Sequence, residues 1–298
     1  MRALFIEHDH VSLGGPIWRA FEKHGYEIER FLIVPEGKYA TPNLEVTFPN
    51  FFDYDVIVPM GAPYGAYEDD RIGKWLIPEL NKLQAAHNAG IPILGICFGG
   101  QLMARALGGS VARSPRAELG WFEIESDDKT LIPQGPWFEY HWDRWQTPKG
   151  ATEIARTDLC SQAFVMGRTL GLQFHPEIDS EVLEAWLAME GGCAEVEAEG
   201  VDVEKLREQT LREQPFSQVR AFELVDSFLR RVATAEVEAE GVDVETLREQ
   251  TLREQPFSQV RAFELVDSFL RRVATAEVVK HSEKFEASPA LSQSAVSK

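Results

Sequence analysis

The stretch Ile93-Leu94-Gly95-Ile96-Cys97-Phe98-Gly99-Gly100-Gln101 decides the fold of this chain. The apolar run that ends at Ile96 predicts a buried parallel strand, and residues 101–107 have the composition of a helix. Cys97 stands between them, with Gly95 and Gly99 two residues away on either side. This is the layout of a nucleophile elbow, a tight turn that forces its central residue into a sparsely populated backbone conformation. Because the N–H groups that begin the next helix favour a thiolate, Cys97 is a candidate nucleophile.

A second stretch, Gly171-Leu172-Gln173-Phe174-His175-Pro176-Glu177, supplies a candidate base. A cysteine nucleophile needs a base, and the base needs an acceptor that orients it. Residues two apart in an extended segment face the same side, so Glu177 can reach the ring of His175. A cysteine at the end of a buried strand is often only a small core residue. The presence of this second stretch argues against that interpretation of Cys97.

Residues 95–101, together with His175-Pro176-Glu177, resemble the class I (triad) glutamine amidotransferases over about residues 1 to 190. The resemblance implies that Cys97 attacks the side-chain amide of glutamine. A glutamyl thioester would form, ammonia would leave, and water would release glutamate. His175 would be the general acid and base, and Glu177 would orient it.

Residues 1–110 alternate strands with helices, which predicts an α/β fold with a mostly parallel, doubly wound, flavodoxin-like sheet. Strands are expected at 3–6, 27–34, 55–59 and 91–96, and helices at 16–24, 70–89 and 101–107. Shorter strands at 122–126, 153–155, 163–166 and 169–174 predict an antiparallel extension of this sheet, which the family also has. A helix capped by Ser180 is expected over 180–190. Catalytic groups belong at the carboxyl ends of the parallel strands.

The oxyanion and substrate-binding residues are assigned around the ends of two strands. The turn Met60-Gly61-Ala62-Pro63 is equally compatible with an ordinary turn and with a source of N–H donors for an oxyanion hole. The resemblance implies the second role, although Ala62 stands where the family usually has glycine. We expect Gly61, Ala62, Phe98 and Gln101 to take part in oxyanion or substrate binding.

The aromatic stretch Trp137–Trp145 contains two further candidates, His141 and Asp143. The stretch is compatible with core packing, but its resemblance to a His-x-Asp loop of the family implies that both residues line the glutamine pocket. Glu118-Leu119-Gly120-Trp121 also resembles a family segment and is interpreted as structural. His8, His10, His24 and His87 show no metal-ligand spacing and are interpreted as having no special role.

The C-terminal third contains one segment twice. Residues 194–234 and 235–275 differ only by Lys205 in the first copy and Thr246 in the second. Each copy is expected to form a helical hairpin, with Pro215 opening the second helix of the first copy. We therefore expect a catalytic domain over 1–190, duplicated hairpins within 191–275 and a disordered tail over 276–298. The spare copy is expected to promote self-association.

Composition limits the classes of partner. The 298 residues carry a formal net charge of −18, which argues against nucleic acid and anionic membranes as partners. Cys97, Cys160 and Cys193 have no paired spacing, so neither a disulfide framework nor a metal site is expected. No Gly-rich nucleotide-binding loop occurs in the sequence, so no synthetase domain is expected within it, and no cofactor is expected. The absence of a signal sequence or membrane span predicts a cytoplasmic location.

Three functions follow from these observations. The first is an amidotransferase that hydrolyses glutamine and passes ammonia to a small acceptor or to a separate synthetase chain. The second is a stand-alone hydrolase of γ-glutamyl compounds, with the same cysteine, histidine and glutamate. The third is a non-catalytic binding module, which the complete triad disfavours.

Overall fold

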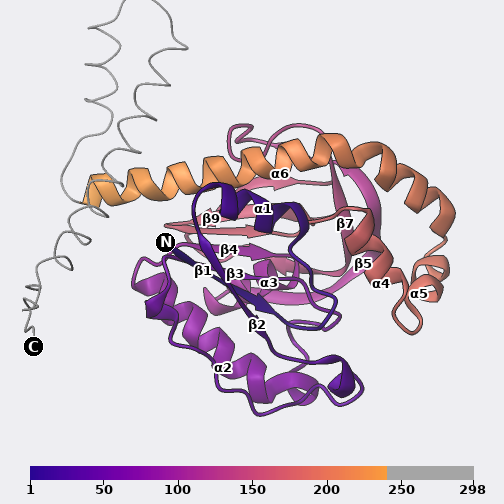
Figure 1. Ribbon diagram of the computed structural model, residues 1–298, viewed down its shortest axis with the longest axis horizontal. Coiled ribbons are helices and arrows are strands. Elements are labelled where there is room, and N and C mark those ends of the chain that lie inside the picture. Colours follow the sequence, from indigo (N-terminus) through magenta and orange to yellow (C-terminus); the bar gives the residue numbers. More distant parts are fainter. Residues whose placement is uncertain (240–298) are drawn as a thin grey trace, which may run out of the picture. The chain divides into compact units, whose positions relative to one another are not determined.

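The computed structural model describes residues 1–239 (Figure 1). Side chains are described for residues 1–231. Residues Met1–Ala233 form one compact unit. Its strands are β1 (Arg2–Glu7), β2 (Glu27–Leu32), β3 (Val56–Pro59), β4 (Ile93–Ile96), β5 (Ser110–Glu123), β6 (Glu125–Ser126), β7 (Pro136–Gln146), β8 (Thr152–Arg156), β9 (Ser161–Met166) and β10 (Thr169–Leu172). Its α-helices are α1 (Gly15–Lys23), α2 (Asp69–Asn88), α3 (Phe98–Ala106), α4 (Ser180–Leu187), α5 (Gly192–Ala198) and α6 (Val203–Ala239), with short 3-10 turns at Glu36–Lys38 and Phe51–Asp53.

The main sheet has eight strands in the order β2-β1-β3-β4-β10-β9-β8-β6. The strands from β2 to β10 are parallel, and β9, β8 and β6 continue the sheet in antiparallel pairs. The predicted α/β class, with a mostly parallel sheet and an antiparallel extension, is confirmed. The carboxyl ends of the neighbouring parallel strands β3, β4 and β10 lie at the same edge of the sheet. The candidate residues Gly61, Cys97 and His175 follow these three strands.

Helices cover both faces of this sheet (Figure 1). On one face, side chains such as Phe5, Val58 and Ile96 pack with α1 and with the later part of α6. On the other face, Ile6 and Ile57 pack with α2 and α3. The alternation of neighbouring residues between the two faces is the period-two pattern of a strand buried on both sides.

A second, two-stranded sheet was not expected at its full length. β5 begins at Ser110, well before the strand expected at 122–126, and pairs antiparallel with β7. The aromatic stretch Trp137–Trp145 lies within β7, where residues 137–139 are buried and the following residues alternate between partly exposed and buried positions. Many of them are apolar or aromatic on both faces, so the sequence did not show a simple polar–apolar alternation.

Two local expectations near residue 190 need correction, and one short helix was not expected. Asp179, and not Ser180, caps α4, because its carboxylate accepts the Val182 N–H at 3.0 Å. The helix ends at Leu187 and not at residue 190. Gly191 has a left-handed φ of 85°, and a short helix, α5, begins at Gly192.

The expected break at Pro215 is also wrong. α6 continues through Pro215 as a single helix from Val203 to Ala239. An interior proline costs about 3 kcal/mol because it removes a hydrogen bond and crowds the preceding turn. Burial of Leu206 on one side of Pro215 and of Ala221, Leu224 and Phe228 on the other offsets that cost.

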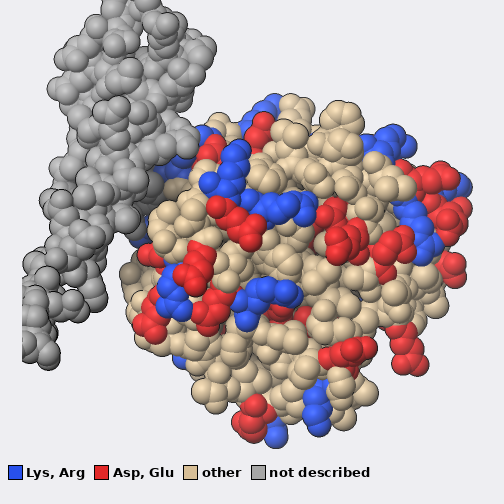
Figure 2. Space-filling model, in the orientation of Figure 1, with Lys and Arg blue, Asp and Glu red and all other residues tan. Residues whose placement is uncertain are grey.

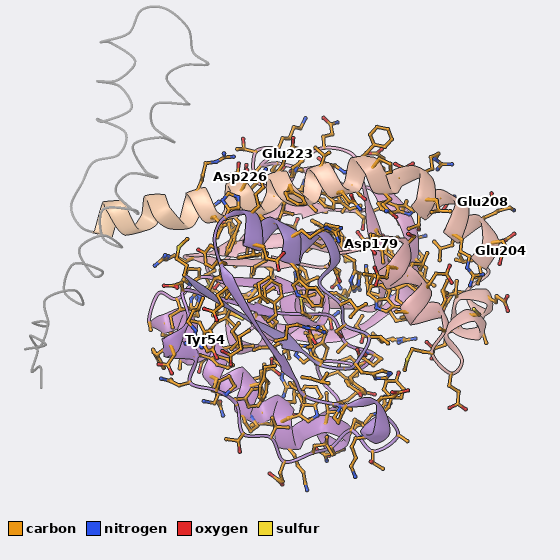
Figure 3. All side chains as sticks on the ribbon, in the orientation of Figure 1. Tyr54, Asp179, Glu204, Glu208, Glu223 and Asp226 are labelled. Atoms are coloured by element: carbon orange, nitrogen blue, oxygen red, sulfur yellow. The ribbon has the colours of Figure 1, made fainter. Side chains whose placement is uncertain are left out.

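The later part of α6 is anchored on α1 and the sheet. Asp226 pairs with His24 at 3.4 Å, and Lys23 lies over the ring of Phe222 at 5.4 Å. Figure 3 shows Glu223 and Asp226 on this part of the helix, and Glu204 and Glu208 near its beginning. Val225 is buried on this part of α6, whereas Val219 is 57% exposed.

Acidic and basic side chains are interspersed on the face shown in Figure 2, and no helix of the described residues is long and apolar enough to cross a membrane. The second copy, apart from its first residues in α6, and the tail expected over 276–298 lie outside the described residues. The division at residue 190 and the self-association of the spare copy therefore stay predictions.

Deletion of residues 235–275 is expected to leave folding and activity unchanged. The first copy already supplies the residues of α6 that pack in the core. Residues 276–278 repeat residues 235–237, so the deletion preserves the sequence through Val237. Thermal unfolding, glutaminase activity and sedimentation should match the parent, with no gain in oligomer size. Loss of folding or activity would show that the second copy is integral to the domain.

Candidate active site

Cys97 occupies a strained turn between β4 and α3. Its φ of 49° and ψ of −104° make it the one non-glycine residue with positive φ among the described residues. A side chain at Gly95 would lie 2.6 Å from the Gly99 carbonyl oxygen, and one at Gly99 would lie 1.9 Å from the Pro59 carbonyl oxygen. The glycines are therefore required by close backbone approach, as the elbow predicts. The Cys97 N–H also donates to the Leu172 carbonyl at 2.8 Å, which fixes the turn against β10.

His175 and Glu177 lie just beyond β10, the strand that pairs with β4. His175 Nδ1 and Glu177 Oε1 are 2.7 Å apart, and both side chains are almost completely buried. Burial acts to lower the pKa of His175, but the charges of Glu177 and Cys97 outweigh it and hold that pKa well above its ordinary value. A Nδ1–H that donates to a carboxylate leaves Nε2 available for proton transfer.

Two glutamines lie beside the Cys97 sulfur. Gln173 Nε2 donates toward Cys97 Sγ at 3.7 Å, and Gln101 Nε2 donates to Gln173 Oε1 at 3.4 Å. Amide hydrogens that point at sulfur favour the thiolate. Sequence reasoning missed Gln173, although it lies in the quoted His175 stretch on the same extended segment.

The turn after β3 lies against the same centre. Gly99 N–H donates to the Met60 carbonyl at 3.1 Å, which ties the turn to the elbow. A side chain at Gly61 would meet the His175 ring at 3.2 Å, so Gly61 packs directly against the base. Gly61 and Ala62 line the same pocket as Cys97 and His175.

One pocket of about 600 Å³ collects these residues. All nine predicted site residues line it: Cys97, His175, Glu177, Gly61, Ala62, Phe98, Gln101, His141 and Asp143. Residues that the sequence did not single out also line it, among them Asp9, Ser12, Tyr39, Arg71, Arg113, Trp142, Glu195 and Glu199. Glu195 lies in α5 and Glu199 directly follows it, so both lie beyond residue 190. Glu199 accepts the Trp142 indole N–H at 2.8 Å.

Asp143 is held on the pocket wall by several contacts. Its carboxylate accepts the Tyr67 hydroxyl at 3.1 Å and lies 3.9 Å from Arg113 Nη1. Its backbone carbonyl lies 2.9 Å from His141 Nδ1. The register of β5 against β7 shifts between Arg113 and Glu118, so the strand ladder is irregular beside Asp143. The His141 ring therefore steadies the wall where strand pairing is interrupted.

Behind His141 lies a buried polar cluster. His141 Nε2 is 3.1 Å from Glu118 Oε2 and 3.2 Å from Glu139 Oε2. Burial acts to lower the pKa of His141, but its contacts with the carboxylates of Glu118 and Glu139 raise it to about 10. Burial raises the pKa of Glu139, whereas the His141 contact outweighs burial at Glu118 and lowers its pKa. The Glu118 segment, interpreted as structural, thus supports the pocket.

Cys160 completes this cluster. Ligand atoms of Glu118, His141 and Cys160 lie within 4.8 Å of one another, a spacing that could hold a metal ion. Hydrogen bonds also converge on Glu118 Oε2. Gln162 donates to it at 2.8 Å, and Cys160 donates to it at 3.6 Å. The cluster is therefore also consistent with a hydrogen-bonded wall of the pocket.

The fold and site define a class of enzyme-like domain with a cysteine at an elbow and a His–Glu pair at the neighbouring strand end. The family model for glutamine amidotransferase class-I matches residues 38–189. The chain belongs to the class I glutamine amidotransferase family.

Curated relatives are GMP synthases described as glutamine-hydrolysing. The Aeropyrum pernix enzyme is 37% identical over 116 residues, which cover 34% of this chain and 22% of that protein. The Corynebacterium jeikeium enzyme is 31% identical over 180 residues, which cover 55% of this chain and 32% of that protein. The chain thus spans between a fifth and a third of the length of these relatives.

Solved structures agree with the fold. A glutamine amidotransferase from Thermotoga maritima has a TM-score of 0.66 and 27% identity, covering 78% of this chain and 98% of that one. A glutamine amidotransferase from Methylobacillus flagellatus has a TM-score of 0.64 and 23% identity, covering 77% of this chain and 94% of that one. The similarity extends beyond residues 38–189, since each comparison covers more than three quarters of the chain.

Proposed function

We propose that the chain hydrolyses the side-chain amide of glutamine through a thioester on Cys97 and releases ammonia for an acceptor. Cys97 is the nucleophile, His175 the general acid and base, and Glu177 its orienter. The observation that carries the proposal is the strained Cys97 elbow in one pocket with the 2.7 Å pair of His175 and Glu177.

The first half of the reaction forms the thioester. The Cys97 thiolate attacks the amide carbon of glutamine, and the carbonyl oxygen takes the negative charge. His175, protonated because of its raised pKa, gives a proton to the amide nitrogen. The C–N bond breaks, ammonia leaves, and the glutamyl group stays on the sulfur.

The second half uses the same histidine in reverse. His175 has given up its proton and now takes one from a water molecule that attacks the thioester carbon. The C–S bond breaks, glutamate leaves, and the Cys97 thiolate and the protonated His175 are restored. Glu177 stabilises the imidazolium and holds the ring in position throughout.

The oxyanion needs two N–H donors. Phe98, the residue after the nucleophile, supplies one, and Ala62, at the end of the turn after β3, supplies the other. Asp143 also lines the pocket, and its carboxylate suits the α-amino group of glutamine. Gln101 acts through Gln173 on the sulfur.

The acceptor of ammonia is proposed to lie on another molecule. The relatives named GMP synthase are several times longer than the matched region, so they carry further sequence that this chain does not match. The proposed acceptor is either a separate synthetase chain or a small molecule. The three free cysteines fit a cytoplasmic location.

A second candidate is hydrolysis of larger γ-glutamyl compounds by the same residues. The volume of about 600 Å³ lies within the ~300–1,000 Å³ range of pockets for drug-sized ligands, which is more than a single amino acid needs. The extra wall from Trp142, Glu195 and Glu199 would face the leaving group.

The deciding experiment measures glutamate release from glutamine and from γ-glutamyl dipeptides with the same enzyme preparation. Comparable or higher kcat/KM on glutamine supports the first function, and a clear preference for dipeptides supports the second. Glutamate release from neither substrate, with an intact thiol at Cys97, would contradict both and favour a binding module.

A further inference from the structure

His8, at the end of β1, makes two buried polar contacts that the mechanism above does not use. Its Nδ1 lies 3.3 Å from the Gly61 carbonyl oxygen, and its Nε2 lies 3.1 Å from Glu79 Oε1 on α2. The side chains of His8 and Glu79 are both 0% exposed. A buried ionisable pair of this kind is costly unless its partners are well placed. The sequence pattern gave no reason to separate His8 from the other histidines.

The contacts fix which atom carries hydrogen. A carbonyl oxygen can only accept, so the 3.3 Å contact requires a hydrogen on His8 Nδ1. Glu79 holds the other ring nitrogen and so fixes the orientation of the ring. Ser12 Oγ lies 3.0 Å from the same Gly61 oxygen, and the Asp9 carboxylate lies 2.8 Å from that hydroxyl. Because Ser12 has one hydroxyl hydrogen for these two acceptors, His8 is the donor that holds the Gly61 carbonyl whenever Ser12 donates to Asp9.

Holding this carbonyl also sets the direction of an N–H group. The described residues contain no cis peptide bond, so the peptide between Gly61 and Ala62 is trans and planar. In such a peptide the C=O and N–H point in opposite directions. With the Gly61 oxygen turned toward His8 and Ser12, the Ala62 N–H points away from them. Gly61 and Ala62 line the pocket beside Cys97 and His175.

The same ring touches the residue that carries the other donor. The rings of His8 and Phe98 are 4.7 Å apart, edge to face at 69°. Phe98 is 1% exposed and begins α3 directly after Cys97. One buried histidine thus contacts Phe98 and the carbonyl of the peptide group that carries the Ala62 N–H.

We propose that His8, held by Glu79, is a positioning residue that aims the Ala62 N–H into the oxyanion hole. The proposal rests on the proposed function, in which an oxyanion forms on the attacked amide. Preorganised donors of this kind act most strongly on the transition state, where the charge develops. His8 should therefore affect kcat more than KM.

The test uses the double variant His8→Phe, Glu79→Leu in the full chain. Phenylalanine keeps a ring against Phe98, and leucine avoids leaving a buried carboxylate without a partner. We expect kcat on glutamine to fall by about 10-fold to 10²-fold, short of the ~10²-fold to 10³-fold loss of a whole oxyanion donor. KM should change little. The γ-aldehyde of glutamate, which forms an oxyanion adduct with a thiolate, should bind more weakly by a similar factor.

A conservative variant and a matched control separate positioning from packing. His8→Asn keeps a side-chain N–H near the position of Nδ1 and should recover part of the lost kcat. His10→Phe alters a histidine two residues away that packs on Tyr39 and should leave kcat unchanged. Alkylation of Cys97 by iodoacetamide, which needs no oxyanion hole, should proceed at the wild-type rate in all variants.

The outcomes are distinct. An active wild type with an equally active double variant would overturn the role of His8 alone. A parallel loss of kcat, alkylation rate and melting temperature, with no recovery in His8→Asn, would overturn it in favour of simple packing. A wild type that hydrolyses neither glutamine nor γ-glutamyl dipeptides would instead overturn the proposed function.

Discussion

Cys97→Ser is expected to abolish ammonia release from glutamine, with a loss of roughly 10³-fold or more in kcat. The site is built for a thiolate, since the sulfur receives an amide hydrogen from Gln173 and contributes to the raised pKa of His175. A serine hydroxyl does not ionise under these conditions and is a far weaker nucleophile. Coupled assays for ammonia and glutamate at saturating glutamine give the measurement.

The other cysteines provide the matched controls for this prediction. Cys193→Ser alters a partly exposed thiol that donates to the Leu187 carbonyl at 3.4 Å, and it should leave activity nearly intact. Cys160→Ser keeps a hydroxyl that can donate to Glu118, so it should also retain most activity. Burial raises the pKa of the Cys160 thiol, which makes it slow to alkylate. Equal labelling of all three cysteines by a low dose of alkylating agent would contradict a special Cys97.

The elbow and the His–Glu pair could be predicted because their signals are local. Gly95, Cys97 and Gly99 lie within five residues, and the close approach of neighbouring backbone leaves only glycine at the flanking positions. His175 and Glu177 are two residues apart in an extended segment, so their contact follows from the geometry of the chain. The parallel strands could be predicted for a similar reason, since they are short apolar runs bounded by turns.

The supporting walls of the pocket could not be predicted because they join distant segments. His8 meets Glu79 across 71 residues, and Trp142 meets Glu199 across 57. Nothing in the local pattern separates His8 from His10 or marks Glu79 as its buried partner. His8 and Glu79 meet only when α2 packs on the sheet that contains β1. No rule of alternation or spacing in the sequence predicts that contact.

The C-terminal helix shows how tertiary packing overrides a local rule. Pro215 is a reasonable first residue of a helix, and the sequence therefore predicts a break there. The buried side chains on both sides, from Leu206 to Phe228, belong to the core of the same compact unit. A continuous helix buries both sets at once. The energy of that burial decides the structure.

Glu177→Gln is expected to reduce activity less than the loss of His175 does. The amide can still accept the His175 Nδ1–H, but it removes the negative charge that holds the pKa of His175 well above its ordinary value. A lower pKa leaves less imidazolium at neutral pH to protonate the leaving ammonia. The high-pH side of the kcat profile should therefore shift to lower pH in this variant, because His175 now loses its proton earlier.

His175→Ala is expected to reduce kcat by at least the ~10²-fold to 10⁴-fold typical of lost general acid–base catalysis. The His175 ring lies 4.8 Å from Trp186 and packs against Gly61, so alanine leaves a space in the pocket wall while the backbone bond from His175 N to the Phe138 carbonyl at 2.8 Å remains. The chain should therefore fold, and its melting temperature serves as the control. Without the imidazolium, the Cys97 thiolate loses its closest cation, and its alkylation near neutral pH should slow as well. Added imidazole can enter a pocket of about 600 Å³ and should restore part of the activity. Full glutaminase activity in His175→Ala would contradict the assignment of the triad, because no other described residue is hydrogen-bonded to Glu177 in this way.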